Sequence, residues 1–120
     1  MKLFIVDDSA IVCDRLSEHL HAIPNIEVIG SSGHVKDSIT LIKKLKPDAV
    51  VLDIRLIDGN GIDVLYEIKH NMPEVKVLVF TNHPYPHYRE RCTDEGADYF
   101  FNKSSEFEKL IETVKTISIN

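Results

Sequence analysis

Short hydrophobic runs alternate with longer amphipathic stretches along the whole chain. A brief, nearly continuous apolar run is typical of a strand that is buried on both faces of a sheet. The second of five such runs is interrupted by Glu27, so we predict that this strand lies at an edge of the sheet. The five predicted strands are Leu3–Val6, Ile26–Ile29, Ala49–Leu52, Val75–Phe80 and Tyr99–Phe101.

Between the strands, apolar residues recur every three or four positions, which predicts helices over residues 9–22, 34–45, 60–70 and 85–95. Pro84 and Pro86 leave the start of the fourth helix undefined. A fifth helix near the end of the chain has the clearest stripe, and Ser105 followed by Glu108 predicts a capping box at its start. Its apolar positions are Phe107, Leu110, Ile111, Val114 and Ile117.

The predicted elements follow the order strand–helix five times. Such an alternation is typical of an α/β domain, in which a parallel five-stranded sheet is covered by helices on both faces. The length of 120 residues fits one such domain with its own hydrophobic core.

Net charge, apolar runs and cysteine content exclude several classes of protein. The net charge of −5 argues against a domain that clamps a nucleic-acid backbone, because that role needs clustered Lys and Arg. Neither a leader sequence nor a long apolar run is present, so we expect no signal peptide and no membrane span. Two cysteines do not make a disulfide framework, which favours a reducing, cytoplasmic setting.

Polar residues capable of chemistry follow four of the five predicted strands. Asp7 and Asp8 follow the first strand, Asp53 the third, Thr81 ends the fourth, and Lys103 follows the fifth. Because the carboxyl ends of parallel strands share one edge, we expect these side chains to meet there. Each aspartate could instead simply cap the helix after it, but that explanation does not cover four strand ends at once.

Three carboxylates at one edge repel one another. A pair about 4 Å apart costs roughly 1–4 kcal/mol, and three pairs would take a large share of the ~5–15 kcal/mol that stabilises a small domain. Protonation of one carboxylate, insertion of Lys103, or binding of a divalent cation would each offset this cost. Hard oxygen ligands around a partly hydrated site favour Mg²⁺.

The chain resembles the receiver domain of two-component response regulators over essentially its whole length. The resemblance implies one receiver domain over residues 1–120, with a flavodoxin-like, doubly wound (βα)5 fold and strand order 2-1-3-4-5. The matching residues are Asp7-Asp8, Asp53, Gly61 eight residues later, Thr81, and Gly96-Ala97-Asp98 leading to Lys103.

The resemblance also implies a role for each acidic residue. Asp53 would accept the phosphoryl group as an acyl phosphate. Mg²⁺ would be bound directly by Asp8, by Asp53 and by the backbone carbonyl of Arg55, and through a water molecule by Asp7. Phosphoryl transfer needs in-line positioning and charge neutralisation, which a cation and an ammonium can provide.

Three further residues gain a role from the same resemblance. Thr81 would bond to one phosphoryl oxygen and Lys103 would pair with another. Phe100, three residues before Lys103, stands where the family usually has a switch aromatic, often Tyr. Thr81 and Phe100 would then couple phosphorylation to a surface change, although Phe100 could instead be an ordinary core residue.

The implied function is a signalling switch with self-catalysed phosphotransfer and dephosphorylation, not an enzyme acting on a separate substrate. A sensor histidine kinase or a phosphotransfer protein would donate the phosphoryl group. The surface formed by the fourth helix, fifth strand and fifth helix would then bind a downstream protein, a second copy in a phosphorylation-dependent homodimer, or an output domain absent from this sequence. We expect no direct contact with nucleic acid or membrane.

Several positions depart from the family pattern. Ile57 and Ser104 stand where Pro is common, and Asn82 follows Thr81 where a small residue is usual. Arg55 and His83, two residues beyond Asp53 and Thr81, occupy positions that tend to set how fast the phosphoryl group is lost. We expect Arg55 to fold over the site and hinder the attacking water.

Other functions stay open at this point. An aspartyl phosphatase would usually carry an acid two residues after its nucleophile, where this chain has Arg55. A flavin-binding module would need a first loop that accepts phosphate, which Asp7 and Asp8 would repel. A receiver-like interaction domain that is never phosphorylated would not need the complete residue set.

The segment from His83 to Tyr88 has an unusual composition, His-Pro-Tyr-Pro-His-Tyr. His83 and His87 could share a helical face and bind a metal, although no third ligand is evident. Tyr85 and Tyr88 could instead contribute to a partner surface, or pack locally around the prolines.

Overall fold

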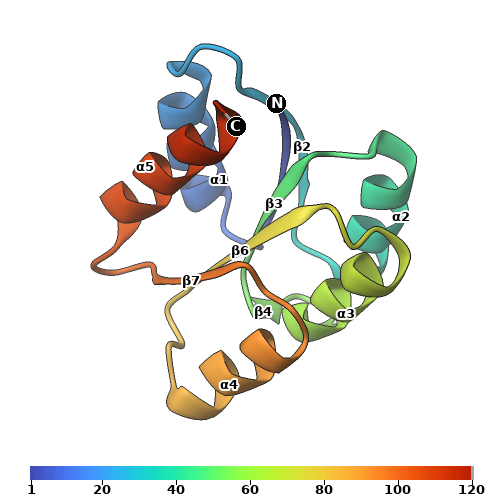
Figure 1. Ribbon diagram of the computed structural model, residues 1–120. Helices are drawn as coiled ribbons and strands as arrows, with labels where there is room; N and C mark the ends of the chain where they lie inside the picture. Colours follow the sequence, from blue (N-terminus) through green and yellow to red (C-terminus); the bar gives the residue numbers. More distant parts are fainter. Residues whose placement is uncertain (120) are drawn as a thin grey trace.

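The computed structural model describes residues 1–119, and a parallel five-stranded sheet lies at its centre (Figure 1). The order across the sheet is β2-β1-β3-β6-β7, which is 2-1-3-4-5 when these strands are numbered along the chain. The predicted fold class and strand order are therefore confirmed, and the strand that contains Glu27 lies at an edge. The strands are β1 (Lys2–Val6), β2 (Glu27–Ser32), β3 (Ala49–Leu52), β6 (Lys76–Thr81) and β7 (Tyr99–Asn102).

In the part of the chain that the structure describes, five helices cover the sheet, with α1 and α5 on one face and α2, α3 and α4 on the other (Figure 1). Within residues 1–119, none of these helices has the length and apolar character needed to cross a bilayer. Their bounds are α1 (Ala10–His21), α2 (Val35–Leu45), α3 (Gly61–Asn71), α4 (Pro86–Asp94) and α5 (Phe107–Ser118).

Two separate hydrophobic clusters flank the sheet because successive side chains of a strand point to opposite faces. In β1, Leu3 and Ile5 pack with α1 and α5, whereas Phe4 and Val6 pack with α2 and α3. All four side chains are completely buried. This double burial explains why the strands are nearly continuous hydrophobic runs rather than alternating ones.

A two-stranded hairpin follows β3 and was not predicted. It consists of β4 (Arg55–Leu56) and β5 (Gly59–Asn60), paired antiparallel. Each strand has only two residues, too few to establish a two-residue periodicity in the sequence. The hairpin matters for the site because it begins two residues after Asp53 and immediately precedes α3.

The predicted capping box at the start of α5 is wrong. The residue that precedes the helix is Glu106, not Ser105, and it makes no side-chain cap. The Glu106 carboxylate instead accepts a hydrogen bond from the Asn102 backbone N–H at 2.9 Å, which lowers the pKa of Glu106. One acidic residue thus ties the end of β7 to the start of α5, in place of the pair of reciprocal bonds that the sequence pattern indicated.

The Gly96-Ala97-Asp98 segment has a structural role at the far end of β7. Asp98 Oδ2 accepts hydrogen bonds from the Lys69 ammonium and from the Val77 N–H, both at 2.8 Å. Gly96 has a φ of +94°, which favours glycine, and it packs against the aliphatic part of Lys69. The motif therefore attaches β7 to β6 and α3 before the strand runs towards the site.

We expect the Cys92 thiol to resist alkylation in the folded protein. Its side chain is only 1% exposed, and burial raises its pKa to about 11. The folded state therefore favours the protonated thiol. The contribution of this thiol to the free energy of unfolding is lost as the pH rises from about 9 towards 11. Mass spectrometry after iodoacetamide treatment at neutral pH should find Cys92 modified only when denaturant is present.

Cys13 provides an internal comparison, because it is half-buried and burial also raises its pKa. It should react slowly in the folded protein, yet before Cys92. Equal labelling of Cys92 with and without denaturant would show that α4 opens far more readily than its packing indicates.

Candidate functional site

Three carboxylates meet at the carboxyl edge of the sheet, as the strand pattern predicted. Asp7 and Asp8 follow β1, and Asp53 follows the neighbouring β3. One carboxylate oxygen from each lies within 4.8 Å of the others. The Asp53 N–H donates to the Val6 carbonyl at 2.8 Å, which extends the β1–β3 ladder to the site itself.

Lys103 bridges two of these carboxylates. Its ammonium lies 2.6 Å from Asp7 Oδ2 and 2.8 Å from Asp53 Oδ2. The three side chains are 8%, 3% and 7% exposed, respectively, so the ion pairs are shielded from water. Of the three ways to offset carboxylate repulsion, the structure therefore shows insertion of Lys103.

Burial and charge act in opposite directions on these groups. Burial raises the pKa of Asp7, and the opposing effects of Lys103 and of the Ser9 N–H do not offset it. Burial alone would lower the pKa of Lys103, but the hydrogen bonds and charges of Asp53 and Asp7 together outweigh it and raise the pKa. Lys103 is consequently a permanent cation at neutral pH.

The donor set fits a hard divalent cation. One ammonium among three carboxylates leaves two negative charges uncompensated, and all the acidic donors are oxygen atoms. Asp8 is exposed and gives the cluster an open side. The other two carboxylates are oriented by backbone donors, since Asp53 Oδ1 accepts from the Ile54 N–H at 2.7 Å and Asp7 Oδ1 from the Ser9 N–H at 2.8 Å.

Thr81 ends β6 at the same edge and is completely buried. Its carbonyl accepts a hydrogen bond from the Lys103 N–H at 2.9 Å, which couples the fourth and fifth strand ends of the sheet. Its hydroxyl accepts a hydrogen bond from the His83 N–H at 3.0 Å. In this state the Thr81 hydroxyl therefore holds the loop that leads to α4.

Phe100 lies on β7 opposite Val79 and packs against the core beneath α4. The Arg89 guanidinium lies 5.1 Å from the centre of its ring, within the range of a cation–π contact. Phe100 is half-buried, so it has contacts with both the core and the α4 surface.

Gly61 contacts the backbone of Asp53. A Cβ atom at position 61 would lie 2.0 Å from the Asp53 carbonyl oxygen, and the Gly61 N–H donates to the Ile54 carbonyl at 2.5 Å. The start of α3 can therefore approach Asp53 this closely only because residue 61 has no side chain. This contact gives a physical reason for glycine eight residues after Asp53.

Sequence reasoning missed a second close contact, in the loop between β2 and α2. A Cβ atom on Gly33 would lie 2.8 Å from the Asp8 Cα. Glycine followed by a helix was the only trace of this contact in the sequence, and many loops share it. The loop supplies no acidic or basic side chain to the cluster, but it packs directly against one of its residues.

The aromatic segment before α4 does not place His83 and His87 on one helical face. The helix begins at Pro86, so His83 lies outside it and the two histidines share no helical face. Tyr85 stacks nearly parallel to His87 with ring centres 6.0 Å apart, and His87 contacts Tyr88 at 4.3 Å. Among residues 1–119, the aspartate cluster is the one group of three or more potential acidic, His or Cys ligands.

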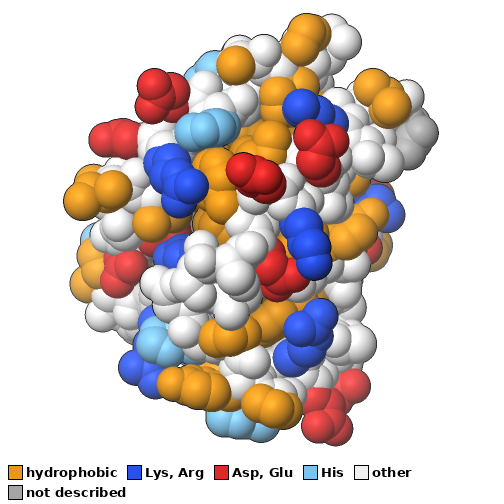
Figure 2. Space-filling model, turned by 90° about the vertical axis from the view of Figure 1, so that its left-hand side faces the viewer, with side chains coloured by type: hydrophobic (Ala, Val, Ile, Leu, Met, Phe, Trp, Pro, Cys, Tyr) orange, Lys and Arg blue, Asp and Glu red, His pale blue; other side chains and the backbone are white. Residues whose placement is uncertain are grey.

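The surface around these elements carries mixed charges. Figure 2 shows the side of the molecule that bears α5 and α4, where basic and acidic side chains are interspersed among apolar ones. No continuous basic face is visible in this view, in agreement with the net charge of −5.

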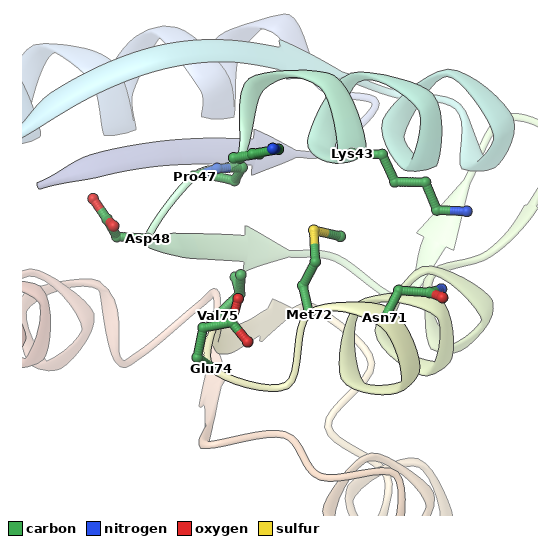
Figure 3. Close-up of a pocket in the computed structure, with 8 residues that line it drawn as sticks. Lys43, Pro47, Asp48, Asn71, Met72, Glu74 and Val75 are labelled. Atoms are coloured by element: carbon green, nitrogen blue, oxygen red, sulfur yellow. The ribbon is translucent and has the colours of Figure 1, made fainter.

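A groove lies at the opposite edge of the sheet, between the ends of α2 and α3 (Figure 3). It has a volume of about 720 Å³ and is lined by residues that precede β3 and β6, such as Asp48 and Val75. The groove is therefore separated from the aspartates by the length of the strands. Lys43, Met72 and Glu74 give it a mixed lining.

Comparison with known proteins agrees with this geometry. The profile of the response regulator receiver domain family matches residues 3–115. The chain belongs to this family. As a receiver domain, it is 30% identical over 115 residues to the response regulator protein VraR of Staphylococcus epidermidis, covering 96% of this chain and 55% of that protein. It is 31% identical over 117 residues to the transcriptional activator DevR/DosR of Mycobacterium tuberculosis, covering 98% and 54%.

Among solved structures, a DNA-binding response regulator of the LuxR family from Staphylococcus aureus superposes with a TM-score of 0.89 at 25% identity. The match covers 98% of both chains. The receiver domain described here spans about half the length of the curated relatives it matches.

Proposed function

We propose that this receiver domain takes a phosphoryl group onto Asp53 in a Mg²⁺-dependent reaction and thereby changes the surface it offers to a partner. The observation that carries the proposal is the pairing of a buried Asp53 carboxylate with Lys103, beside two further carboxylates at the sheet edge. Among residues 1–119, Asp7 alone shares the strand-end position and the pairing with Lys103, and the resemblance to receiver domains assigns phosphate acceptance to Asp53.

The chemistry follows from this arrangement. An Asp53 carboxylate oxygen attacks phosphorus, the bond from phosphorus to the donor's histidine nitrogen breaks, and an acyl phosphate forms while the donor keeps its electron pair. Asp8, Asp53 and the Arg55 carbonyl would hold Mg²⁺, with Asp7 acting through water. Bound Mg²⁺ supplies neutralisation of the phosphoryl charge. Lys103 moves from a carboxylate oxygen to a phosphoryl oxygen and keeps its charge throughout.

Phosphorylation would reach the surface through Thr81. A bond from its hydroxyl to the phosphoryl group directs that hydroxyl towards the site and ends its role as acceptor for the His83 N–H. The β6–α4 loop is then released, and Phe100 fills the space that Thr81 leaves. The surface of α4, β7 and α5 changes as a result. Because Phe100 has no hydroxyl group, no hydrogen bond from this side chain can signal the change to a partner.

The donor would be a sensor histidine kinase or a phosphotransfer protein in the cytoplasm. The readout would be a downstream protein, a homodimer or an output domain, and the domain would hydrolyse its own acyl phosphate rather than turn over a separate substrate. The curated relatives are about twice as long, and DevR/DosR is described as a DNA-binding activator. By analogy, binding of nucleic acid would be the task of another domain and not of this one.

Labelling with acetyl phosphate tests the proposal directly. The purified domain should gain one phosphoryl group in the presence of Mg²⁺ and none with excess EDTA, as measured by intact-protein mass spectrometry. Hydroxylamine should remove the label, because it cleaves acyl phosphates but not phosphoesters. A domain that stays unlabelled at saturating donor and Mg²⁺ would instead be a receiver-like interaction module.

Arg55 should control how long the acyl phosphate lasts. Its side chain is exposed at the start of the hairpin that follows Asp53, and it forms no ion pair within the described part of the chain. It is thus free to fold over a phosphorylated Asp53 and hinder the attacking water. Arg55→Ala should shorten the lifetime by roughly tenfold, or ~1.4 kcal/mol of activation free energy.

The decay of the isolated phosphorylated protein measures this lifetime after the donor is removed. Arg91→Ala, an exposed position on α4, serves as the matched loss of a positive charge. An unchanged lifetime in Arg55→Ala, or an equal change in both variants, would contradict the shielding role.

A further inference from the structure

The loop between β2 and α2 connects the two loops that carry the proposed metal ligands. On one side, Gly33 packs against the Asp8 backbone so closely that a Cβ atom would lie 2.8 Å from the Asp8 Cα. On the other side, the Gly33 carbonyl accepts a hydrogen bond from the Ile57 N–H at 3.0 Å. Ile57 lies in the hairpin turn that follows Asp53 and Arg55. The three loops therefore form one packed unit.

Asp58 provides a second connection in this unit. Its Oδ1 accepts a hydrogen bond from the Val35 N–H at 2.5 Å, and its Oδ2 lies 3.5 Å from the Lys36 N–H. These two N–H groups belong to the first turn of α2, where backbone donors have no acceptor within the helix itself. A carboxylate at this position is also favoured by the helix dipole. The Val35 bond lowers the pKa of Asp58. The carboxylate that caps α2 thus comes from a different loop, 23 residues away.

The residue that would ordinarily cap α2 does not do so. His34 has the extended backbone of an N-cap, with φ −118° and ψ 144°, but its side chain makes no capping hydrogen bond. Serine, threonine, asparagine or aspartate at that position could cap the helix locally. Because position 34 is His, the cap of α2 and the attachment of the hairpin both depend on the Asp58 carboxylate.

We propose that Asp58 is a positioning residue for the metal site, which holds the Asp53–Asn60 segment against the β2–α2 loop and so fixes the Arg55 carbonyl relative to Asp8. The inference rests on the proposed function, because it assigns Asp58 to the Mg²⁺ site which that function requires. Mg²⁺ demands nearly ideal octahedral geometry, so a small change in ligand spacing weakens binding. Residues that orient metal ligands typically change metal affinity by about 10–100-fold when they are removed.

Helix capping alone is the competing explanation, and His34 allows the two to be separated. In the double variant Asp58→Ala/His34→Ser, a local serine caps α2 while the hairpin stays unattached. Asp58→Asn removes the charge but keeps an oxygen that can accept the Val35 N–H. Together with the single variant Asp58→Ala, these two variants distinguish attachment of the hairpin, stability of α2 and long-range charge.

Calorimetric titration with MgCl₂ alone, together with thermal melting in EDTA, provides the two measurements. Asp58→Ala should bind Mg²⁺ about tenfold more weakly and melt about 4–8 °C lower. Asp58→Asn should remain close to the parent chain in both. Asp58→Ala/His34→Ser should regain the melting temperature but keep the weak Mg²⁺ binding.

Recovery of Mg²⁺ affinity in the double variant would overturn the inference, because the effect would then come from α2 stability. Equal losses of affinity in Asp58→Asn and Asp58→Ala would also overturn it, in favour of simple charge. Unchanged affinity in Asp58→Ala would do so while leaving the proposed function intact. Failure of the parent chain to bind Mg²⁺ would contradict the proposed function and the inference with it.

Discussion

Asp53→Asn should reduce phosphorylation by acetyl phosphate or by a kinase to background. The substitution keeps the size of the side chain but replaces a carboxylate oxygen with an amide, which cannot form an acyl phosphate. It also removes one of the two carboxylates that pair with Lys103. Asp7 remains as a partner at 2.6 Å, and two of the three carboxylate repulsions are lost, so the variant should stay folded.

The measurement is intact-protein mass spectrometry after incubation with donor and Mg²⁺, with circular dichroism to confirm folding. Asp94→Asn is the matched control, because it makes the same chemical change at an exposed position on α4. Label that survives Asp53→Asn would reassign the acceptor, and peptide mapping would then show whether Asp7 or Asp8 had taken the group. A screen of candidate kinases with the same pair of variants would also identify the donor.

Gly61→Ala should be the most destabilising single-methyl change in the domain, with a loss of about 3 kcal/mol or more in the free energy of unfolding. The added Cβ would lie 2.0 Å from the Asp53 carbonyl oxygen, 3.0 Å from its carbon and 3.1 Å from the Ile54 Cα. All three neighbours are backbone atoms, so no side-chain rotation relieves the overlap. Either α3 moves or the backbone of Asp53 and Ile54 does.

Urea denaturation measures the loss, and Gly30→Ala provides the comparison. At position 30 the added methyl would meet the Phe4 ring at 3.1 Å, a contact that a small ring movement relieves, so we expect a loss of roughly 1 kcal/mol. Gly61→Ala should also slow phosphorylation at a temperature where it is folded, because the displaced atoms belong to Asp53. Similar losses in both variants would show that the start of α3 is more adaptable than its packing indicates.

The sequence predicted the sheet, its order and the meeting of the aspartates because these depend on periodicity and topology. Continuous apolar strands and the carboxyl edge of a parallel sheet leave few alternatives for Asp7, Asp8 and Asp53. The position of Lys103 followed from the same argument, although its bridging of Asp7 and Asp53 required the structure.

Contacts between loops could not be predicted in this way. The attachment of Asp58 to Val35 joins residues whose separation in the sequence carries no periodic pattern. The capping pattern at Ser105 had a local competitor, because Glu106 could instead reach back to the Asn102 N–H. Short polar motifs specify which bonds are feasible, whereas the packing of neighbouring elements decides which of them form.

The Lys103 bridge has a consequence for how the protein is made. Because an internal ammonium already neutralises part of the acidic cluster, the chain has no need to wait for a metal ion before it completes its fold. Structural zinc domains differ in this respect, since many of them are unfolded without their metal. We therefore expect newly synthesised receiver to complete its fold even when magnesium is scarce.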